Sequence, residues 1–527
     1  MSAIPTTRPA APAVAGAGST PRRREVAAGQ QVLAPAVAAS ALWLHLHLPF
    51  LPLEVLLRGL APGRACVLVQ GEGSRRRVCM VNTRAATLGV RSGMPLDAAH
   101  ALGDLVEFAR NESTEQQALT SLGLWAMQFT PVVSLVPPDG LLLEIKGSLR
   151  LFHGLDGLLA RLRQGLKQLG YRVQYAVAAP PLAATLLARG SARTIVLDTH
   201  ELKRALADLP VESLRLSVAQ QEAFASIGVR NLGECRRLAR SDLARRLSPA
   251  VVDLLDRAYG QLADPRVAMP MTRVFDAALE LPWEVRQAPA LVIAGERLLH
   301  ELIGYLRAHG AMTRQLRWSL RDRNQQRERF EIRLTRAGRE YEQMALLLRE
   351  MLMRMQLKAP ICAIRLEVDD LVYGSPTTAT DLFGGRPQAT DEAYAAFADR
   401  LRSRCGEQAL RSVALQPDRR PELAWCWRHG DSRSRQALVK SAAPADASMR
   451  PLWLVKEPVT LPTRRGLPQF DGPLQLVAER ERIDTGWWDG NAMARDYFIA
   501  TTTRGSRLWV YKELDGERRW RLHGVFE

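Results

Sequence analysis

Two histidines near the start of the chain have the types and spacing of metal ligands. His45 and His47 lie in the stretch ALWLHLHL (41–48), where alternating residues predict a strand with both imidazoles on one face. An HxH pair ligates a metal at some barrel-type hydrolase sites. The seven other histidines form no HExxH motif and no second pair. We therefore interpret His45 and His47 as structural residues, with a metal-dependent hydrolase as an alternative.

A single carboxylate precedes the next strand candidate. In PPDGLLLE (137–144), Asp139 and Gly140 stand directly before an apolar run. Metal-assisted phosphoryl transfer needs carboxylates that hold two cations about 3.5–4 Å apart, and the sequence shows no such cluster. Asp-Gly also makes a favourable turn, so these residues alone favour a turn role for Asp139.

A glycine turn between two helical segments offers backbone donors for a phosphate. The segment 227–238 reads IGVRNLGECRRL and contains Gly228, Arg230 and Gly233. N–H groups at such a turn can bind a phosphate without reading bases. A bare helical hairpin explains the same pattern, and both interpretations remain open.

Arginines alternate with apolar residues on two successive strand candidates, 315–321 and 329–334. One face would carry side chains such as Leu316 and Trp318, and the other would be strongly basic. An ordinary solvated face mixes charges more evenly. We interpret this face as a non-specific, salt-sensitive contact to a phosphate backbone, made by Arg317, Arg321, Arg323, Arg327, Arg329 and Arg333.

The composition limits the class of protein that positions these residues. The chain has 527 residues, a formal net charge of +17 and a pI near 10.2, which favours a polyanionic partner. No run reaches the roughly 18 apolar residues of a membrane span. The six scattered cysteines form no CxxC pair and indicate reduced thiols in the cytoplasm rather than a zinc ribbon or a disulfide framework. The Ala/Pro-rich residues 1–40 lack the apolar region of a secretory signal, and we expect a disordered leader there.

The order of predicted elements indicates an α+β multidomain protein. Mixed strands and helices extend to about residue 205, with strands at 140–145 and 172–178 and a helix at 155–169. The segment 209–260 is helical in pattern. From residue 272 the order β-α-β-β-α-β indicates one sheet-and-helix unit. The last stretch, from residue 450, combines short strands with many tryptophans and predicts a β-rich domain.

In this order, the segments resemble the Y-family (translesion) DNA polymerases, and specifically the ImuB family of catalytically deficient polymerase-like proteins. The best marker is NTRAATLGVRSGMP (82–95), which is similar to the fingers motif N-Y-E-A-R-K-x-G-V-x-S-x-M-P. Thr83 stands where active members have the tyrosine beside the incoming sugar, and Ala86 where they have a triphosphate-binding arginine.

By the same resemblance, the other motifs match the Y-family patterns in position but lack several of the side chains that carry catalysis in active members. His45 stands at the metal-binding aspartate of the opening h-D-h-D-x-F-F strand. Asp139 retains one carboxylate of the S-x-D-E-A-x-x-D motif, but Gly140 replaces the catalytic glutamate. The segment PLAAT (181–185) lacks both lysines of K-x-x-A-K. We therefore expect no polymerase activity, no metal site and no cofactor.

The resemblance implies a right-hand fold with an added C-terminal β-rich domain. It divides the ordered chain into a palm-like region (41–50 and 110–205), fingers (51–109), a helix-hairpin-helix thumb (206–268), a β-α-β-β-α-β little finger (272–373), a connector (374–448) and a partner-binding domain (449–527).

The resemblance also implies partners. ImuB-like proteins resemble a hub that joins the sliding clamp, a RecA-like accessory protein of the ImuA type and an error-prone DnaE-type polymerase. Asp381, Leu382 and Phe383 in the connector are similar to a Q-L-x-L-F clamp peptide without its glutamine, and Arg450–Trp453 is a competing match. The tail motif RIDTGWWDG (482–490) makes Trp487, Trp488 and Asp489 candidates for partner contact, although paired tryptophans are more often part of a core.

Together these expectations describe a non-catalytic adaptor in damage-induced (SOS) translesion synthesis, cytoplasmic and nucleoid-associated, that binds DNA through its backbone. An active Y-family polymerase with a rearranged metal site is the principal alternative.

Overall fold

The computed structural model describes residues 41–59, 63–191, 193–374, 388–406, 409–416, 418–429 and 450–526. The expected leader (1–40) and the clamp-like peptide (Asp381, Leu382 and Phe383) lie outside these ranges. The described chain forms two compact units, one of residues 41–55 with 64–273 and one of residues 56–63 with 274–526. None of the helices in the described ranges is both long and apolar enough to cross a membrane.

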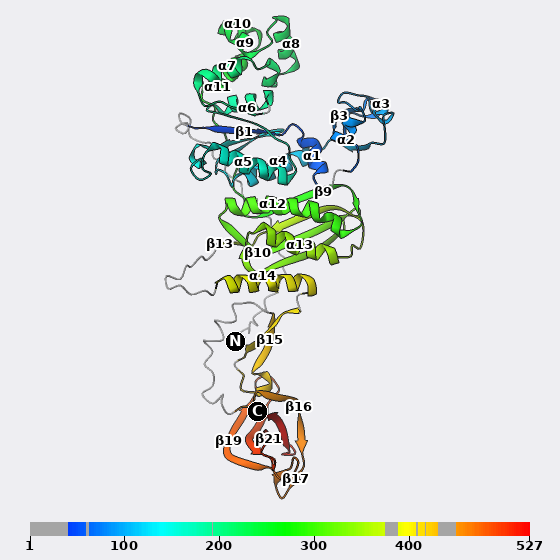
Figure 1. Ribbon diagram of the computed structural model, residues 1–527, viewed down its shortest axis with the longest axis vertical. Helices are drawn as coiled ribbons and strands as arrows, with labels where there is room; N and C mark the ends of the chain where they lie inside the picture. Colours follow the sequence, from blue (N-terminus) through cyan, green and yellow to red (C-terminus); the bar gives the residue numbers. More distant parts are fainter. Residues whose placement is uncertain are drawn as a thin grey trace, which may run out of the picture. The chain divides into compact units, whose positions relative to one another are not determined.

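The first unit is built on a five-stranded sheet of order β5-β6-β1-β7-β8. Its central strand β1 (Trp43–His47) is buried along its whole length because it pairs with an antiparallel neighbour on each side. Figure 1 shows helix α6 over one face of this sheet, with α4 and α5 on the other. The remaining elements are β5 (Val133–Val136), β6 (Gly140–Glu144), β7 (Gln174–Ala178), β8 (Arg193–Ile195), α4 (Glu112–Ala126), α5 (Leu155–Leu169) and α6 (Pro181–Gly190).

A small subdomain follows helix α1 (Leu51–Leu57) in the chain. Its three-stranded sheet has the order β3-β2-β4, and Val67, Val78 and Leu96 belong to its apolar core. The elements are β2 (Cys66–Gln70), β3 (Arg77–Val81), β4 (Val106–Ala109), α2 (Thr83–Thr87) and α3 (Leu96–His100).

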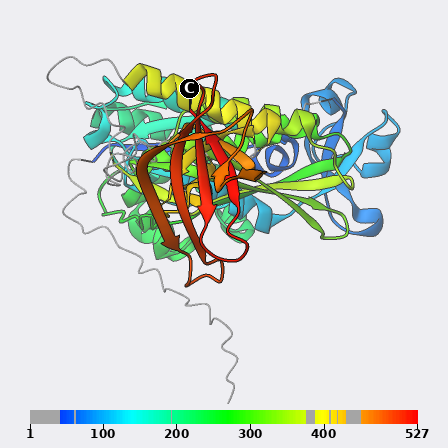
Figure 2. The same ribbon diagram turned by 90° about the horizontal axis from the view of Figure 1, so that it is seen from below.

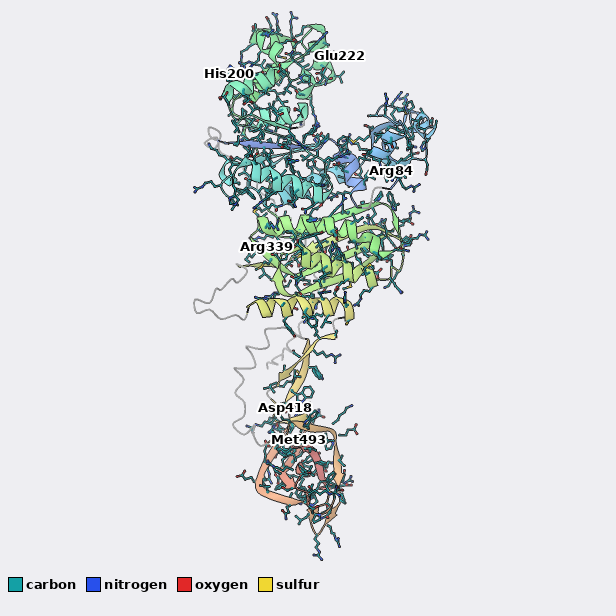
Figure 3. All side chains as sticks on the ribbon, viewed as in Figure 1. Arg84, His200, Glu222, Arg339, Asp418 and Met493 are labelled. Carbon is teal, nitrogen blue, oxygen red and sulfur yellow. The ribbon has the colours of Figure 1, made fainter. Side chains whose placement is uncertain are left out.

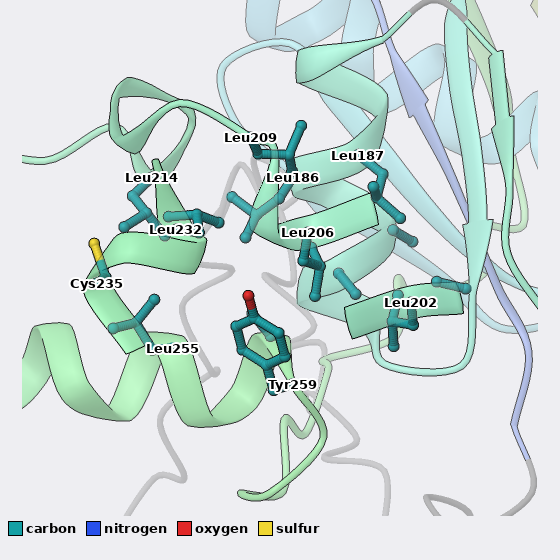
Figure 4. Close-up of a cluster of buried hydrophobic side chains, with 14 of the residues drawn as sticks. Leu186, Leu187, Leu202, Leu206, Leu209, Leu214, Leu232, Cys235, Leu255 and Tyr259 are labelled. Atoms are coloured by element: carbon teal, nitrogen blue, oxygen red, sulfur yellow. The ribbon is translucent and has the colours of Figure 1, made fainter. Parts of the chain in front are cut away.

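The helical segment at the end of the first unit shares its core with the sheet. Leu186 and Leu187 of α6 belong to the same buried cluster as Leu206, Leu232 and Leu255 (Figure 4). This helical region therefore packs as a continuation of the first sheet's helical layer. Its helices are α7 (Thr199–Ala207), α8 (Val218–Ser226), α9 (Leu232–Arg237), α10 (Arg240–Arg246) and α11 (Pro249–Ala258).

The second unit begins with the β-α-β-β-α-β arrangement that the sequence predicts. Its sheet has the order β11-β10-β12-β9, and β13 (Leu371–Tyr373) also pairs with β10. Leu298, Leu302, Trp318, Leu348 and Ile364 are almost fully buried in its core. The elements are β9 (Phe275–Val285), α12 (Val292–Ala308), β10 (Ala311–Asp322), β11 (Arg327–Gly338), α13 (Tyr341–Arg354) and β12 (Ile361–Val368).

Helix α14 (Gln388–Cys405), expected near Glu392–Arg404, packs against α13 and β11. The contact between α14 and these two elements is polar at its centre. The buried carboxylate of Asp399 accepts hydrogen bonds from the backbone N–H of Thr335 (2.7 Å), the Thr335 hydroxyl (2.6 Å) and the side-chain amide of Gln343 (2.9 Å). This part of the expected connector is therefore attached to the preceding sheet-and-helix body.

The C-terminal part is β-rich, as expected. Hairpin β14 (Arg411–Leu415) and β15 (Trp425–His429) precedes a five-stranded antiparallel sheet of order β16-β22-β21-β20-β19, whose strands are coloured orange to red in Figure 2. Both faces of this sheet bury apolar clusters, one around Trp520 and one around Tyr497 and Trp509. The strands of this sheet are β16 (Trp453–Leu461), β19 (Gln475–Thr485), β20 (Met493–Thr501), β21 (Arg507–Glu513) and β22 (Trp520–Val525). A separate two-stranded sheet consists of β17 (Thr463–Arg464) and β18 (Leu467–Pro468). The predicted α+β multidomain fold with an added β-rich domain is confirmed.

Candidate functional site

His45 occupies the space that a side chain at residue 140 would need. It is fully buried at the centre of β1, beside the start of β6. A Cβ atom added to Gly140 would lie 2.5 Å from His45 Cε1 and 2.8 Å from Nε2. These distances are too short for real carbon contacts. With the His45 ring in this place, any side chain at residue 140 would overlap it.

Burial keeps the His45 ring neutral. Burial first, and then the nearby charges of Arg189 and His47, lower the pKa of His45 well below its ordinary range. Its Nδ1 lies 3.4 Å from the Thr185 hydroxyl, which already donates to the Pro181 carbonyl. The hydroxyl can therefore accept from Nδ1–H, which leaves Nε2 unprotonated and without a partner.

The Asp139 carboxylate is neutralised by the guanidinium of Arg215. The side chain lies in the turn between β5 and β6, with Oδ2 2.5 Å from Arg215 and Oδ1 3.7 Å from His47 Nδ1. Burial alone would raise the pKa of Asp139, but His47 and Arg215 outweigh it and hold the pKa well below its usual range. Asp139 is therefore ionised and already paired.

Two more arginines make the surroundings of Asp139 electropositive. Burial first, and then the charge of Arg215, lower the pKa of Arg189 to about 10. Arg266, which also acts on Arg189, has its own partner in Asp264. Among the described residues no carboxylate pairs with Arg189. One positive charge near Asp139 is thus left uncompensated.

A cavity of about 240 Å³ opens beside this pair. Its polar lining consists of two ion pairs, Arg215 with Asp139 and Arg110 with Glu115. Arg110 donates two hydrogen bonds of 2.9 Å to the Glu115 carboxylate. The rest of the lining is mainly apolar and consists of Pro49, Pro52, Leu68, Cys79, Met80 and Pro138.

The residues around Asp139 do not fit a divalent metal centre. In the part of the chain that the structure describes, no three His, Cys, Asp or Glu side chains are grouped so that they could hold a metal ion. The lone carboxylate is bound to Arg215, and His45 Nε2 faces the Gly140 backbone. Among the described residues around Asp139, the ligands that a two-cation polymerase site or an HxH hydrolase site would need are not grouped together.

The fingers-like motif folds as a strand end followed by a capped helix. Asn82 caps α2 by accepting the backbone N–H of Ala85 and also accepts the N–H of Cys66. Thr83 begins α2 and Ala86 is exposed on it. The strand and capped helix of the motif are present, but Thr83 and Ala86 provide neither the aromatic ring nor the guanidinium of the active pattern.

The predicted glycine turn is present, but most of its backbone donors are already used. Gly228 has a φ of +71° with open space around it. The N–H of Arg230 donates to the Glu234 carboxylate at 2.7 Å. Gly233 lies inside α9, where an added Cβ would come 2.9 Å from the Ala207 Cβ. A phosphate at this turn would have to displace Glu234.

The expectation of a strongly basic sheet face at 317–333 is corrected by the structure. The alternation is confirmed, since Arg317 and Arg321 lie opposite Glu331 and Arg327 in the β10–β11 register. Carboxylates from β9, β11 and the loop after β12 neutralise most of the arginines, in the pairs Arg317–Asp369, Arg321–Glu280, Arg323–Glu284 and Arg333–Glu331. Among the described residues, Arg327 and Arg329 have no acidic partner. Residues 274–373 contain 16 Lys and Arg against 14 Asp and Glu, a net of only +2.

The paired tryptophans of the tail are exposed. Trp487 is 78% and Trp488 59% exposed, and their rings meet edge to face at 5.4 Å. Asp489 binds Arg420, which also binds Asp418 and donates to the Asn491 carbonyl. Figure 3 labels Asp418 and Met493 in this region, where the hairpin loop meets the turn before β20.

The sequence did not indicate Arg189, Arg215 or Arg420 as site residues. Arg215 is 76 residues from Asp139 and Arg420 is 69 residues from Asp489. Neither arginine lies in a motif, so only the fold brings these charges together.

Comparison with known proteins agrees with the predicted resemblance. Residues 54–189 match the model of the impB/mucB/samB family. The chain is 26% identical over 474 residues to "Protein ImuB" of Caulobacter vibrioides (strain NA1000 / CB15N), covering 82% of this chain and 98% of the relative. It is also 26% identical over 185 residues to "DNA polymerase IV" of Desulfatibacillum aliphaticivorans, covering 34% of this chain and 46% of that protein.

Solved structures of Y-family polymerases align over 63% of this chain and all of their own. They include DinB from Sulfolobus solfataricus at 16% identity and a Y-family polymerase chimera at 15%, each with a TM-score of 0.35. The resemblance to the ImuB family is confirmed by the curated relative, which aligns over nearly its whole length.

Proposed function

We propose that this chain, a homologue of ImuB, is a non-catalytic polymerase-like adaptor in damage-induced translesion DNA synthesis. The observation that carries the proposal is the contact between His45 and Gly140. With this ring in place a glutamate at residue 140 would overlap His45, and Asp139 stands as one carboxylate bound to Arg215. Without carboxylates to hold two cations, the site has no means to neutralise a triphosphate and assist attack by a 3′ hydroxyl.

Primer extension tests this proposal. The purified chain should not extend a primer–template with any deoxynucleotide, whereas adding the DnaE-type polymerase and the sliding clamp should allow extension across a lesion. Template-directed incorporation by the chain alone, lost in Asp139→Ala, would instead support the alternative of an active polymerase with a rearranged metal site.

We propose that the 41–50 and 110–205 region acts as a palm, 51–109 as fingers, 206–268 as a thumb and 272–373 as a little finger that together hold DNA. Because salt bridges occupy most arginines on the β10–β11 face, Arg327 and Arg329 are the strongest candidates for phosphate contacts. Arg230 beside the glycine turn is a second candidate from the thumb.

The double variant R327A/R329A tests the little-finger contact. The affinity for duplex DNA falls as the salt concentration rises. Removing one arginine that binds a phosphate should make the slope of log affinity against log salt concentration shallower by about 1. The matched control is R323A/R333A, which removes two arginines that carboxylates already neutralise. Equal decreases in both variants would contradict this assignment of the phosphate-binding residues.

We further propose that the connector binds the sliding clamp through Leu382 and Phe383, because two adjacent apolar side chains suit the pockets that clamp peptides fill. The variant L382A/F383A should abolish clamp retention in a pull-down, and R450A/W453A serves as the comparison for the competing match. Unchanged clamp binding in L382A/F383A would remove this part of the proposal.

The C-terminal domain is proposed to recruit the ImuA-type protein and the DnaE-type polymerase. Exposed aromatic pairs are typical of interface anchors, and the pinning of Asp489 by Arg420 supports a fixed presentation of Trp487 and Trp488. W487A/W488A should reduce co-purification of at least one of these partners. L467A, which removes an exposed leucine elsewhere in the domain, is the control. We place this assembly on the nucleoid in the cytoplasm.

A further inference from the structure

The net charge around Asp139 has the opposite sign from that of a cation-binding centre. Arg215 contacts Asp139, and the charges of Arg189 and Arg266 also act on the groups of this site. Asp264 compensates Arg266, and His45 is neutral. The local sum is one uncompensated positive charge, which repels a divalent cation and attracts an anion.

The neighbouring cavity presents arginine rather than carboxylate to an incoming ligand. The Arg215 side chain is 39% exposed against 16% for Asp139, and Arg110 is 29% exposed against 4% for Glu115. In both pairs the acid is less exposed than the guanidinium that it binds, and the ion pair fixes the direction of the guanidinium. Guanidinium groups held in this way retain N–H donors for a second ligand, and their planar geometry suits phosphate oxygens.

We propose that this cavity, lined by Arg110 and Arg215, binds a phosphate group without a divalent cation. The volume of about 240 Å³ accepts a phosphate with part of an attached sugar, and Pro49, Pro52 and Pro138 provide an apolar wall for it. In place of mobile cations held by carboxylates, the chain supplies fixed guanidinium groups. The phosphate belongs either to a DNA strand or to a free nucleotide.

This inference rests on the proposed loss of catalysis, but its test uses no polymerase activity. Titration calorimetry of the full chain in EDTA would use inorganic phosphate, pyrophosphate and a deoxynucleoside triphosphate as probes, and anisotropy in the same buffer would follow a primer–template. We expect at least one probe to bind, and we expect R110A and R215A each to weaken it by about tenfold or more, the effect of removing one charged hydrogen-bonding group.

Asp139→Asn separates a phosphate site from a residual cation site. A phosphate site should bind its probe several-fold more tightly in this variant, because Arg215 loses its competing carboxylate while its charge remains. A cation site would lose binding. R64A, which removes an exposed arginine outside the cavity, is the control and should change nothing. Arg215→Lys, which keeps the charge, covers the case in which R215A does not fold.

The responses of the probes identify the source of the phosphate. Binding of the small probes identifies a free nucleotide, and binding of the primer–template alone identifies a DNA phosphate; both support the site. The proposal is overturned if no probe binds in EDTA, if binding appears only when magnesium is added, or if R110A and R215A bind as well as R64A. Primer extension by the chain alone would overturn the proposed function without affecting the calorimetry.

Discussion

The steric conflict between His45 and residue 140 leads to a quantitative prediction. Gly140→Ala places a methyl carbon 2.5 Å from His45 Cε1 in a fully buried site. Gly140 has no positive φ, so the cost comes from overpacking alone. Overpacking of this kind costs about 1–3 kcal/mol, which leaves a domain of ordinary stability folded.

Removing the His45 ring should remove most of this cost. His45→Ala should itself destabilise the first unit by about 2 kcal/mol, through the cavity it leaves. In His45→Ala/Gly140→Ala the new methyl group fills part of that cavity. The double variant should therefore be more stable than the sum of the single effects by about 1–2 kcal/mol, within the usual range for side chains in contact.

Hydrogen exchange read on peptides from β1 and β6 would measure this cycle, because it reports local stability in a chain of two units. Gly147→Ala is the control, since an added Cβ at Gly147 meets nothing within 4 Å. The steric explanation is refuted if Gly140→Ala costs less than about 0.5 kcal/mol, or if the two substitutions prove additive.

Three further predictions concern the second unit. Arg420→Ala should speed hydrogen exchange in the turn 486–491, because Asp489 loses its ion pair; unchanged exchange would contradict a pinned turn. Asp399→Ala should loosen α14 by about 1–3 kcal/mol, because it leaves the half-buried donors of Thr335 unpaired, and slowed or unchanged exchange in α14 would refute this. Burial lowers the pKa of His523 to about 4, against about 6.5 unfolded. The folded state therefore binds this proton less readily than the unfolded state. The free energy of unfolding of the C-terminal sheet should fall by up to about 3 kcal/mol as pH falls from 6.5 to 4. His523→Gln should reduce this loss, as measured by the pH dependence of unfolding of β20 and β22.

Local periodicity was sufficient to predict the elements. The helix expected at 155–169 is α5 with those bounds, and the strand expected at 140–145 is β6 at Gly140–Glu144. Each prediction depended on residues within a few positions of one another. The alternating faces of β10 and β11 were predictable for the same reason.

Charge compensation was not predictable, because its partners are distant in the sequence. The hairpin arginines looked unpaired since Glu280 and Asp369 come from other parts of the sheet. Likewise Arg58 pairs with Glu301 across 243 positions in a fully buried contact. The tryptophan-rich tail shows the same limit: Trp509 and Trp520 are buried whereas Trp487 is exposed, and composition alone does not distinguish these positions.

The central position of β1 has a consequence for synthesis on the ribosome. β1 ends at His47, but its partners β6 and β7 end at Glu144 and Ala178. About 130 further residues must therefore be made before this apolar strand can pair on both edges. At about 5–20 residues per second, that delay lasts roughly 7–26 s. During this time an unpaired strand edge is open to aggregation, so the nascent chain should be a substrate for chaperones that bind short apolar segments.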